Sequence, residues 1–277
     1  MAIKTGLIGS PLKSSLSPRL FNIFSGLLGE KFNYTLKEAG PPELGKAIEE
    51  IKKSGWRGFN VTLPLKERVF PFLEKAHKAA AGIAAVNAVL IRGGRLEGFN
   101  TDARALEYSL KENKARVGGG TCVIWGAGGA ARAAAWTLAA GGAGEIHIYN
   151  RSYAKARALA AYFSKLFPRV RFKAGKFFSP VPEKAAVFVN ATPLGMYAPL
   201  PKALKVPDLK TGLYCDFAYA PGGTPFLTGR PGKTITGLDL LIYQALASAA
   251  LWTGRRLTAR EIVKLKEKAK RLLCLDI

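Results

Sequence analysis

The sequence predicts an α/β protein with two units built around mostly parallel sheets. Three observations support this fold class. Strand-like runs alternate with helix-like segments along the whole chain. The 277 residues suit two modest domains, and 48% of them are hydrophobic, which allows a sizeable core. Three glycines at residues 118–120 separate a charged helix-like segment from an apolar strand, and we expect a second fold unit to begin near this point.

The first unit begins with strands and helices in alternation. Ser17 as N-cap and Pro18 at the first helical position mark a helix start, and Gly29 ends this helix. Gly55 ends the second helix in the same way. Strands are expected at residues 5–8, 32–36 and 58–62, and helices at residues 17–28 and 42–54.

Two further patterns follow in the first unit. Residues 64–67, Pro-Leu-Lys-Glu, resemble a helix entry and place Lys66 in its first turn. Short strands at residues 87–91 and 96–99 flank the dipeptide Gly93–Gly94, which predicts a hairpin.

The second unit continues the alternation. Strands are expected at residues 121–125, 146–149, 187–190 and 213–217. The last two helices are expected at residues 238–252 and from Thr258 onward. Thr258 and Glu261 together form a capping box, which fixes the start of the final helix.

The chain is strongly basic, with 42 Lys and Arg against 19 Asp and Glu and a formal net charge of +23. Such a balance raises the question of a nucleic-acid or membrane partner. The basic residues are spread over the whole chain, so nucleic-acid binding is not favoured, and a basic protein also attracts anionic ligands. The densest patch predicts a solvated helix face of Lys264, Lys266, Lys268, Lys270 and Arg271, opposite an apolar side of Ile262, Leu265, Leu272 and Leu273.

Several classes of protein find no support in the sequence. No apolar run reaches the roughly 18 residues of a transmembrane helix, and residues 1–8 lack the pattern of a secretory signal. Cys122, Cys215 and Cys274 are isolated, which favours a reducing cytoplasm. Two histidines are too few for a metal cluster, so no metal is expected, and neither a hydrolase G-x-S-x-G motif nor a P-loop occurs.

Residues 126–131, Gly-Ala-Gly-Gly-Ala-Ala, fit the pattern G-x-G-x-x-A directly after the strand at residues 121–125. The first glycine permits a tight turn, the second lets the backbone approach a pyrophosphate, and the small last residue allows the helix to pack closely. An Ala-rich helix follows from Arg132, so its N-terminus faces the anion. A strand before the motif and a helix after it favour dinucleotide binding over an ordinary glycine turn.

The end of the next strand indicates which dinucleotide is bound. An NAD enzyme usually carries an acid there to hold the ribose 2′-hydroxyl. This chain has Arg151 instead, with Ser152 and Lys155 close by. A cation with further donors suits a 2′-phosphate, so NADP is favoured over NAD. The alternative is a solvated loop arginine.

Three polar residues are candidates for chemistry. Lys66, in the first turn of its expected helix, would have its pKa lowered by the helix dipole toward that of a general acid or base, although most lysines are simply solvated. Asp102 follows a strand and could instead cap the next helix. Gln244 lies on an apolar helix face with Leu241 and Ser248, so it is satisfied internally or directed at a ligand.

A series of motifs follows in order along the full length of the chain. They are GSPLKSSLSP at residues 9–18, NVTLPLK at 60–66, AVN at 85–87, NTD at 100–102, GAGGAAR at 126–132, NRS at 150–152, NATPLGM at 190–196, DFAYAPGGTP at 216–225, and Gln244 with WTG at 252–254. Together these motifs resemble the shikimate dehydrogenase family. The resemblance implies reversible, NADPH-dependent reduction of 3-dehydroshikimate to shikimate in aromatic amino-acid (chorismate) biosynthesis.

The resemblance also implies roles for individual residues. Lys66 and Asp102 would be the catalytic pair, the lysine supplying the proton and the carboxylate orienting it. Substrate contacts would be Ser15, Ser17, Thr62, Asn87, Tyr219 and Gln244, with the two serines on the substrate carboxylate. Cofactor contacts would be Gly126, Ala127, Gly128, Gly129, Ala130, Asn150, Arg151, Ser152, Lys155, Thr192, Met196 and Gly237.

The family fold implies an N-terminal α/β substrate domain at residues 1–101, completed by helices at 239–277. A doubly wound Rossmann NADP-binding domain would occupy residues 102–238, with the active-site cleft between the two. A small-molecule substrate, no membrane and a monomer or homodimer are expected.

The sequence departs from the family pattern at Ala88, Ala103, Ala105 and Leu240. Because these positions flank the expected ligands, substrate preference stays open. The alternatives are a quinate/shikimate dehydrogenase of broader specificity and a non-catalytic NADP- or nucleic-acid-binding relative.

Overall fold

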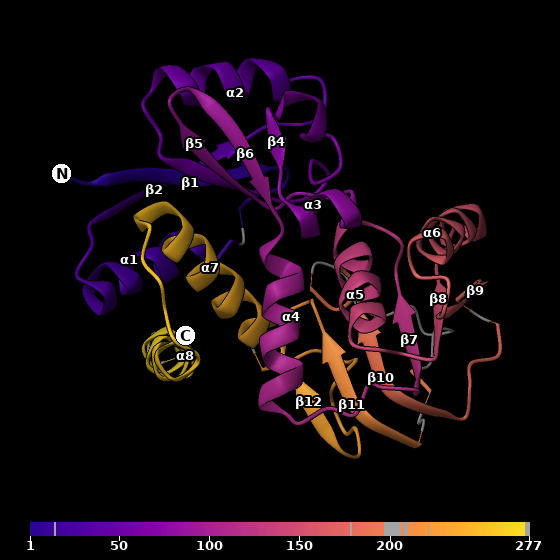
Figure 1. Ribbon diagram of the computed structural model, residues 1–277. Helices are drawn as coiled ribbons and strands as arrows, with labels where there is room; N and C mark the ends of the chain where they lie inside the picture. The colour runs from indigo at the N-terminus through magenta and orange to yellow at the C-terminus, as the bar shows by residue number, and fades with distance from the viewer. Residues whose placement is uncertain (14, 178, 197–205, 208–209, 221, 275–277) are drawn as a thin grey trace. The chain divides into compact units, whose positions relative to one another are not determined.

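The chain folds into two units, each with its own sheet (Figure 1). The computed structural model describes all residues except 14, 178, 197–205, 208–209, 221 and 275–277. Unit 1 comprises residues 1–104 and 241–277, and unit 2 comprises residues 105–240. The boundaries expected from the sequence, after residues 101 and 238, lie close to these. Unit 1 is therefore discontinuous in the sequence, and unit 2 is one continuous stretch.

Unit 1 contains a mixed six-stranded sheet in the order β2-β1-β3-β5-β6-β4. β1 lies between β2 and β3 and is parallel to both, whereas β5 and β6 form an antiparallel hairpin. The predicted hairpin is confirmed, and both of its turn glycines have positive φ. The strands are β1 (Ile3–Gly9), β2 (Phe32–Glu38), β3 (Gly58–Val61), β4 (Lys75–Ala76), β5 (Ala88–Arg92) and β6 (Arg95–Phe99).

The helices of unit 1 bury apolar faces against this sheet. One face is covered by Leu44, Ile48 and Ile51, which pack with Phe59 and Val61 of β3. Its helices are α1 (Ser17–Leu28), α2 (Leu44–Lys53), the 3₁₀ turn η1 (Phe70–Phe72), α3 (Lys78–Ile83) and α8 (Ala259–Cys274). Helices α4 (Thr101–Glu112) and α7 (Gly237–Thr253) each begin in one unit and end in the other.

Helix α7 is tied into the first sheet although it is far away in the sequence. The indole Nε1 of Trp252 donates a hydrogen bond of 2.9 Å to the carbonyl of Val89 in β5. A Cβ on Gly58 would lie 2.2 Å from that indole nitrogen, so β3 must carry a glycine at this point. Helix α7 is therefore packed against the sheet of unit 1.

Unit 2 is a doubly wound domain with a parallel six-stranded sheet in the order β12-β11-β10-β7-β8-β9. The chain order reverses between β7 and β10, where such folds bind ligands at the carboxyl ends of the strands. Its elements are β7 (Thr121–Trp125), α5 (Gly129–Ala140), β8 (Glu145–Tyr149), α6 (Tyr153–Leu166), β9 (Arg171–Gly175), β10 (Lys184–Asn190), β11 (Lys210–Asp216) and β12 (Lys233–Ile235).

Two local predictions about helix starts are wrong. Ser17 is not an N-cap: Leu16 already has helical dihedral angles and takes that position, and its carbonyl accepts from the Leu20 N–H at 3.0 Å. Lys66 is not in the first turn of a helix, because residues 66–69 form turns that lead into η1. Lys66 therefore has no helix N-terminus of its own beside it, and the helix dipole expected at this position is absent.

The final helix is predicted well at its start and less well along its faces. Thr258 Oγ1 accepts from the Glu261 N–H, and Glu261 Oε2 accepts from the Thr258 N–H, which confirms the capping box. The expected solvated face contained Lys266, which is only 5% exposed and lies 5.4 Å from the ring centre of Tyr243. Leu272, expected on the apolar side, is 42% exposed. The aliphatic part of a lysine side chain can cover apolar surface, so the charge of Lys266 did not indicate that the residue is buried.

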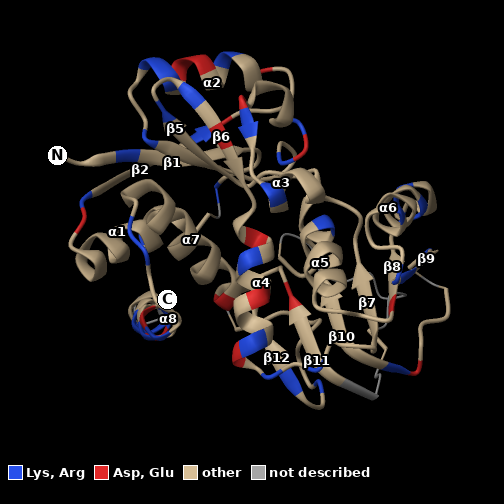
Figure 2. Cartoon of the chain, viewed as in Figure 1, with Lys and Arg blue, Asp and Glu red and all other residues tan. Residues whose placement is uncertain are grey.

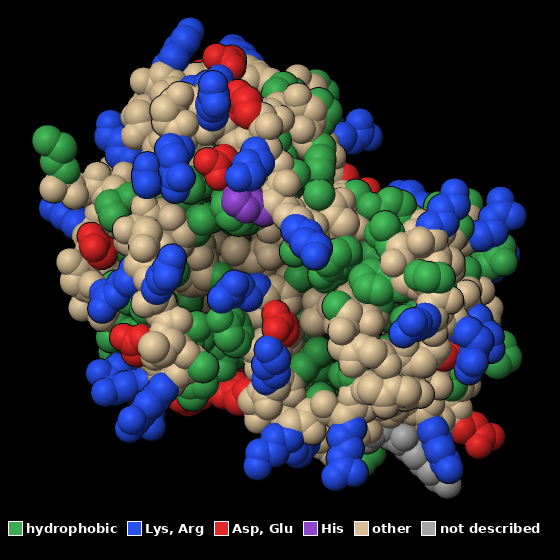
Figure 3. All heavy atoms as spheres, viewed as in Figure 1, with side chains coloured by type: hydrophobic (Ala, Val, Ile, Leu, Met, Phe, Trp, Pro, Cys, Tyr) green, Lys and Arg blue, Asp and Glu red, His purple; other side chains and the backbone are tan. Residues whose placement is uncertain are grey.

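Basic side chains are distributed over both units. Figure 2 shows Lys and Arg on helices and strand ends throughout the chain. On the face seen in Figure 3 they stand at many separate places, interspersed with acidic and apolar side chains. In the part of the chain that the structure describes, no helix has both the length and the apolar character needed to cross a membrane.

Candidate active site

Four chain segments meet at one edge of the sheet in unit 1. The Thr62 N–H donates to the carbonyl of Ile8 at the end of β1, and the Val61 N–H donates to the carbonyl of Asn87, each at 2.9 Å. The Asn87 N–H in turn donates to the carbonyl of Phe99 at the end of β6, at 3.1 Å. Polar residues that follow β1, β3 and β6 are thereby gathered at the carboxyl ends of these strands, the edge at which α/β sheets bind ligands.

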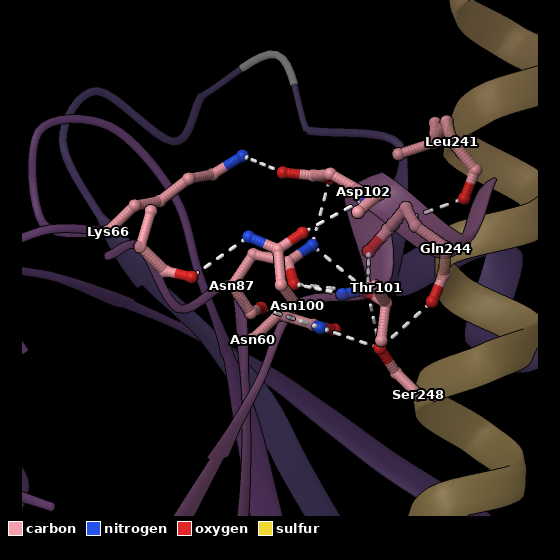
Figure 4. A network of polar contacts seen from close by, with 11 residues as sticks. Asn60, Lys66, Asn87, Asn100, Thr101, Asp102, Leu241, Gln244 and Ser248 are labelled. Carbon is pink, nitrogen blue, oxygen red and sulfur yellow. Dashed lines mark hydrogen bonds and ion pairs between the residues drawn. The ribbon is translucent and has the colours of Figure 1, made fainter. Parts of the chain in front are cut away.

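Lys66 forms an ion pair with Asp102 at this edge (Figure 4). Its Nζ lies 2.6 Å from Asp102 Oδ2, and the two side chains are 14% and 9% exposed. The backbone of Lys66 is fixed because its carbonyl accepts from the Val86 N–H at 2.8 Å. On either side of it, Leu65 and Val69 are fully buried. The lysine head is thus held in one place, partly open to solvent.

Asp102 does not cap helix α4. That role belongs to Asn100, whose Oδ1 accepts from the Ala103 N–H at 2.9 Å. Asp102 is therefore available for other partners in the first turn of α4, where a carboxylate is favoured by the helix dipole. Its Oδ1 accepts from Asn87 Nδ2 at 2.8 Å, while Oδ2 receives Lys66.

The side chain of Asn87 is fully engaged with the protein. Its Nδ2 donates to Asp102 and to Thr101 Oγ1, and its Oδ1 accepts from the Thr101 N–H at 2.6 Å. Only 2% of the residue is exposed. Asn87 was predicted as a substrate contact, and in this structure its hydrogen bonds orient the carboxylate of Asp102.

Further polar groups, buried or half-buried, lie below this pair in the view of Figure 4. Asn60 in β3 donates 2.8 Å to Ser248 Oγ, and accepts 2.9 Å from the hydroxyl of Tyr34. Ser248 Oγ donates to the carbonyl of Gln244 at 2.9 Å. The Gln244 side chain reaches Thr101 Oγ1 at 3.4 Å, so helix α7 contacts the start of α4.

Asn60, Thr101 and Ser248 received no role from the sequence. One signal was present for Ser248, which stands one turn after Gln244 on the same apolar helix face. Asn60 gives another signal, because an amide within the fully buried strand β3 must have partners. Their pairing joins residues 188 positions apart, which no local pattern indicates.

The loop between β1 and α1, which contains Ser10 and Ser15 and is called the serine loop, lies at the same sheet edge as the ion pair, as does Thr62. The Ser10 N–H donates 2.9 Å to the carbonyl of Leu63, which joins the loops after β1 and β3. Ser15 Oγ accepts from the Ser17 N–H at 3.3 Å, and Ser17 is buried. Among the described residues, no hydrogen bond connects Ser15, Ser17 or Thr62 to the lysine–carboxylate pair; Ser14 and Pro221, which belong to the quoted motifs, lie outside those residues.

The glycine loop in unit 2 has the geometry of a phosphate cradle. Gly126 has φ of 112°, and a Cβ there would meet the carbonyl oxygen of Ala191 at 2.8 Å, so only glycine fits. Gly128 is the N-cap of α5 and borders open space, which leaves room for a ligand beside its backbone. With Ala127, Gly129 and Ala130, this loop presents helix N–H groups to an anion at the switch point of the sheet, and it fits a dinucleotide pyrophosphate.

The segment after β8 fits a phosphate rather than a ribose hydroxyl. Arg151, Ser152 and Lys155 are all exposed, and Ser152 is the N-cap of helix α6. Asn150 Nδ2 donates to the carbonyl of Ser152 at 3.0 Å, which shapes this turn. No acid occurs from residue 150 to residue 155. Two cations beside a helix N-terminus suit the 2′-phosphate of NADP.

Of the other predicted cofactor residues, Thr192 and Met196 follow β10, and Gly237 follows β12. Thr192 donates its hydroxyl to Asn190 Oδ1 at 2.7 Å, and Met196 closes the turn that follows. Gly237 begins α7, where a Cβ would meet the Ala218 carbonyl oxygen at 2.1 Å. Tyr219, predicted to contact substrate, belongs to unit 2, whereas the other five predicted substrate residues belong to unit 1.

No group of three or more His, Cys, Asp or Glu side chains suited to a metal ion occurs within the described residues. The chemistry available in unit 1 is that of an ammonium group held by a carboxylate, which is suited to moving a proton.

Comparison with known proteins agrees with this geometry. The family model described as the shikimate dehydrogenase substrate binding domain matches residues 7–89. The shikimate dehydrogenase (NADP(+)) of Carboxydothermus hydrogenoformans is 39% identical over 280 residues, covering 98% of this chain and 97% of that protein.

Two solved structures share the whole fold. The shikimate 5-dehydrogenase of Thermus thermophilus, in complex with NADP(H) and shikimate, is 32% identical with a TM-score of 0.79, covering 98% of this chain and 99% of that chain. The ligand-free 5-ketofructose reductase of a Gluconobacter strain is 30% identical with a TM-score of 0.80, covering 96% of this chain and 98% of that chain. The family-model match, together with 39% identity to a named relative over nearly the full length of both proteins, shows that the chain belongs to the shikimate dehydrogenase family.

Proposed function

We propose that the chain catalyses the reversible NADP-dependent reduction of 3-dehydroshikimate to shikimate, a step of aromatic amino-acid biosynthesis. The observation that carries this proposal is the ion pair of Lys66 and Asp102, at 2.6 Å, in a chain related along its length to NADP-dependent shikimate dehydrogenases. A partly exposed ammonium group fixed by a carboxylate is equipped to give a proton to a developing alkoxide and to take it back in reverse.

The roles of the chain's own residues follow from their contacts. When bound, NADPH supplies the hydride to the ring ketone. Lys66 Nζ donates a proton to the ketone oxygen, and its charge stabilises that oxygen as negative charge develops. Asp102 holds the ammonium group and orients the reacting hydroxyl. Asn87 fixes the Asp102 carboxylate through its Nδ2 at 2.8 Å, and Lys66 regains its proton from solvent.

Substrate recognition is proposed residue by residue from the motif match. Ser15 and Ser17 bind the substrate carboxylate, and Thr62, Gln244 and Tyr219 bind its hydroxyl groups. The motif match supports these roles, together with the position of the serine loop and Thr62 at the same sheet edge as the ion pair.

Cofactor recognition belongs to unit 2. The loop from Gly126 to Ala130 cradles the pyrophosphate, supported by its open space and the helix N-terminus. Asn150, Arg151, Ser152 and Lys155 hold the 2′-phosphate. Thr192, Met196 and Gly237 lie toward the nicotinamide half.

A broader substrate range is the second candidate. The 5-ketofructose reductase relative has the same fold at a TM-score of 0.80, so this architecture also serves a different polyhydroxy ketone. Ala103 and Ala105 follow the catalytic Asp102, and Ala88 follows Asn87, where the family pattern has other residues. Quinate is therefore the competing substrate to test.

The test is oxidation of shikimate and of quinate, each with NADP and with NAD, followed by the absorbance of the reduced nicotinamide. The proposal expects the highest kcat/KM for shikimate with NADP. Comparable kcat/KM for quinate would establish the broader enzyme. Activity with neither substrate would exclude both and leave a non-catalytic relative.

The same proposal assigns a small-molecule partner and a cytoplasmic location. The scattered basic side chains of Figures 2 and 3 support the first, because nucleic-acid binding usually needs a concentrated basic surface. The free and buried thiols of Cys122 and Cys215 support the second. A monomer or homodimer is proposed on the resemblance alone.

A further inference from the structure

Asp216 at the end of β11 is a buried carboxylate that the proposed chemistry does not use. It is 0% exposed, and no ion pair to it occurs among the described residues. Its partners are three neutral donors. Asn190 Nδ2 and the Ala218 N–H donate to Oδ1 at 2.8 and 2.9 Å, and Thr224 Oγ1 donates to Oδ2 at 2.5 Å.

Such a group is costly to keep inside a protein. Burial raises the pKa of Asp216 to about 6, against the lowering effect of its hydrogen bonds to Thr224, Ala218 and Asn190. A buried charge without a cation is retained only where several donors satisfy it. The donors belong to the end of β10 and to the stretch that follows β11, so this carboxylate links the loops after these two strands.

The first segment carries the effect of Asp216 toward Thr192. Asn190, oriented by Asp216, uses its Oδ1 to accept from both the N–H and the hydroxyl of Thr192, at 3.1 and 2.7 Å. The Leu194 N–H then donates to the Thr192 hydroxyl at 3.3 Å. The turn that contains Thr192 and leads to Met196 is therefore shaped by a chain of hydrogen bonds that begins at Asp216.

The other two donors, Ala218 and Thr224, both follow β11 and have closely packed neighbours. Ala218, bonded to Asp216 through its N–H, approaches the start of α7 so closely that only Gly237 fits there. Gly195 has φ of 86°, and a Cβ on it would lie 3.2 Å from Pro225 Cδ, next to Thr224. Asp216 thus holds together the turns that carry Thr192, Tyr219 and Gly237.

The position of these turns in the sheet indicates which half of the cofactor they serve. β10 and β11 lie on one side of β7, and β8, which leads to Arg151, lies on the other. In a doubly wound domain a dinucleotide spans the carboxyl edge across this switch point. With the 2′-phosphate at Arg151, the nicotinamide half lies over the turns that Asp216 organises.

We propose that Asp216 is a positioning residue for the nicotinamide half of the cofactor, acting through Asn190 on Thr192 and through Ala218 and Thr224 on the turns after β11. The inference rests on the proposed function, because it requires NADP in unit 2. Asp216 touches neither reactant, and it sets the shape of the loops that do.

The test compares NADP with adenosine 2′,5′-bisphosphate, which carries the 2′-phosphate and lacks the nicotinamide. Thr224→Val removes the hydroxyl that donates to Asp216 at nearly constant side-chain volume. Thr224→Ser retains a hydroxyl donor and is the matched control. Asp216→Ala removes the whole anchor. Dissociation constants are measured by calorimetry, and folding is checked by thermal unfolding.

Thr224→Val and Asp216→Ala are expected to weaken NADP binding about tenfold or more, the usual effect of losing a hydrogen bond to a charged group. Adenosine 2′,5′-bisphosphate binding should change less than about twofold, well below that hydrogen-bond effect. Thr224→Ser should bind both like the wild type. If Asp216→Ala does not fold, the comparison of Thr224→Val with Thr224→Ser tests the proposal.

Equal losses for the two ligands in a folded variant, or no loss for either, would overturn the positioning role and leave the proposed function intact. A wild-type protein that binds neither ligand would overturn the proposed function, and this inference with it.

Discussion

Lys66 gives one of its three N–H donors to Asp102, and within the described residues no hydrogen bond engages the other two, which we propose for a substrate oxygen. Asp102 in turn is bound on both oxygens, by Lys66 and by Asn87, so its carboxylate has little freedom to rotate. Preorganised groups of this kind need little rearrangement when charge develops on the substrate.

Replacing Lys66 by methionine tests the catalytic assignment directly. Lys66→Met keeps the length of the side chain and removes the proton donor, so kcat should fall by about two to four orders of magnitude. NADP affinity should stay near wild type, because every assigned cofactor residue belongs to unit 2. Steady-state kinetics and a cofactor titration measure the two effects.

Lys111→Met is the matched control. Lys111 is also ion-paired, to Glu107 at 2.6 Å, and its side chain is 71% exposed. It should retain full activity. If Lys66→Met kept more than about a tenth of wild-type kcat, Lys66 would not be the proton donor.

Arg151→Ala tests the choice of cofactor. Loss of a charge-assisted contact to the 2′-phosphate should weaken NADP binding by about 1–3 kcal/mol and affect NAD much less. Arg157→Ala, also exposed and on the helix that follows, is the control and should change neither. Titration of both cofactors gives the answer, and an equal loss for NADP and NAD would exclude a phosphate-reading role.

At the level of single residues, motif and context indicated Lys66 and Asp102, but not what surrounds them. Asn100 and Asp102 are both good capping residues, and only the backbone geometry shows that Asn100 takes the cap. The bond between Asn60 and Ser248 depends on how α7 packs against β3, which periodicity cannot supply.

Among the elements, the segment around Lys66 shows why a helix signal failed. Pro64 favours a helix start, but Pro71 follows within seven residues. Pro71 has no N–H to bond the carbonyl of Glu67, so a helix begun at residue 64 cannot continue through it. The chain forms turns and a short 3₁₀ segment instead. This shape leaves the Lys66 carbonyl free to pair with Val86.

Three strands were not predicted: β4, β9 and β12. β9 is an edge strand with Arg171 and Lys173 pointing outward, both paired with Glu145 of β8. Its residues Arg171, Phe172, Lys173 and Ala174 alternate between polar and apolar, which is the pattern of a half-exposed strand, so the sequence does carry a signal for β9. β4 and β12 have two and three residues, too few for any pattern.

The capping box of α8 predicts a measurable contribution to stability. Thr258→Ala removes the hydroxyl that accepts from Glu261 N–H, and it should lower the free energy of unfolding by about 1 kcal/mol. Thr258→Ser keeps the hydroxyl and should behave like the wild type. Urea denaturation measures both, and an unchanged midpoint for Thr258→Ala would show that the box adds nothing.

For the whole molecule, Asp216 predicts how stability depends on pH. Its pKa is about 6 in the folded protein, against an ordinary value of 3.8, so the folded protein keeps this proton after the unfolded chain has lost it. The contribution of Asp216 to the free energy of unfolding is fully present below about pH 4 and is lost as the pH rises through about 6. The loss is on the order of 3 kcal/mol.

Asp216→Asn removes this titration. The free energy of unfolding of the wild type should therefore fall relative to that of the variant as the pH rises from 4 to 7. Urea denaturation at fixed ionic strength measures this difference. A difference that stays constant over this range would show that Asp216 does not titrate there.

The two-unit architecture could be predicted because several levels of the sequence agree. Alternating strands and helices indicated the α/β class, and the resemblance implied that the last helices rejoin the first unit. The mixed character of the first sheet was not predicted, since the direction of β5 relative to β3 depends on how the connecting segment crosses, not on either strand.

The discontinuity of unit 1 affects how the protein is made. On the ribosome, residues 105–240 emerge as one stretch and can fold while β3 and β5 still lack Ser248 and Trp252. At a translation rate of roughly 5–20 residues per second, the rest of the chain is completed about 10–35 s after the strands of the first sheet have been synthesised. A nascent chain that stops before α7 carries Lys66 and Asp102, yet Asn60 has no Ser248 to bond, so assembly of the site is among the last events of biosynthesis.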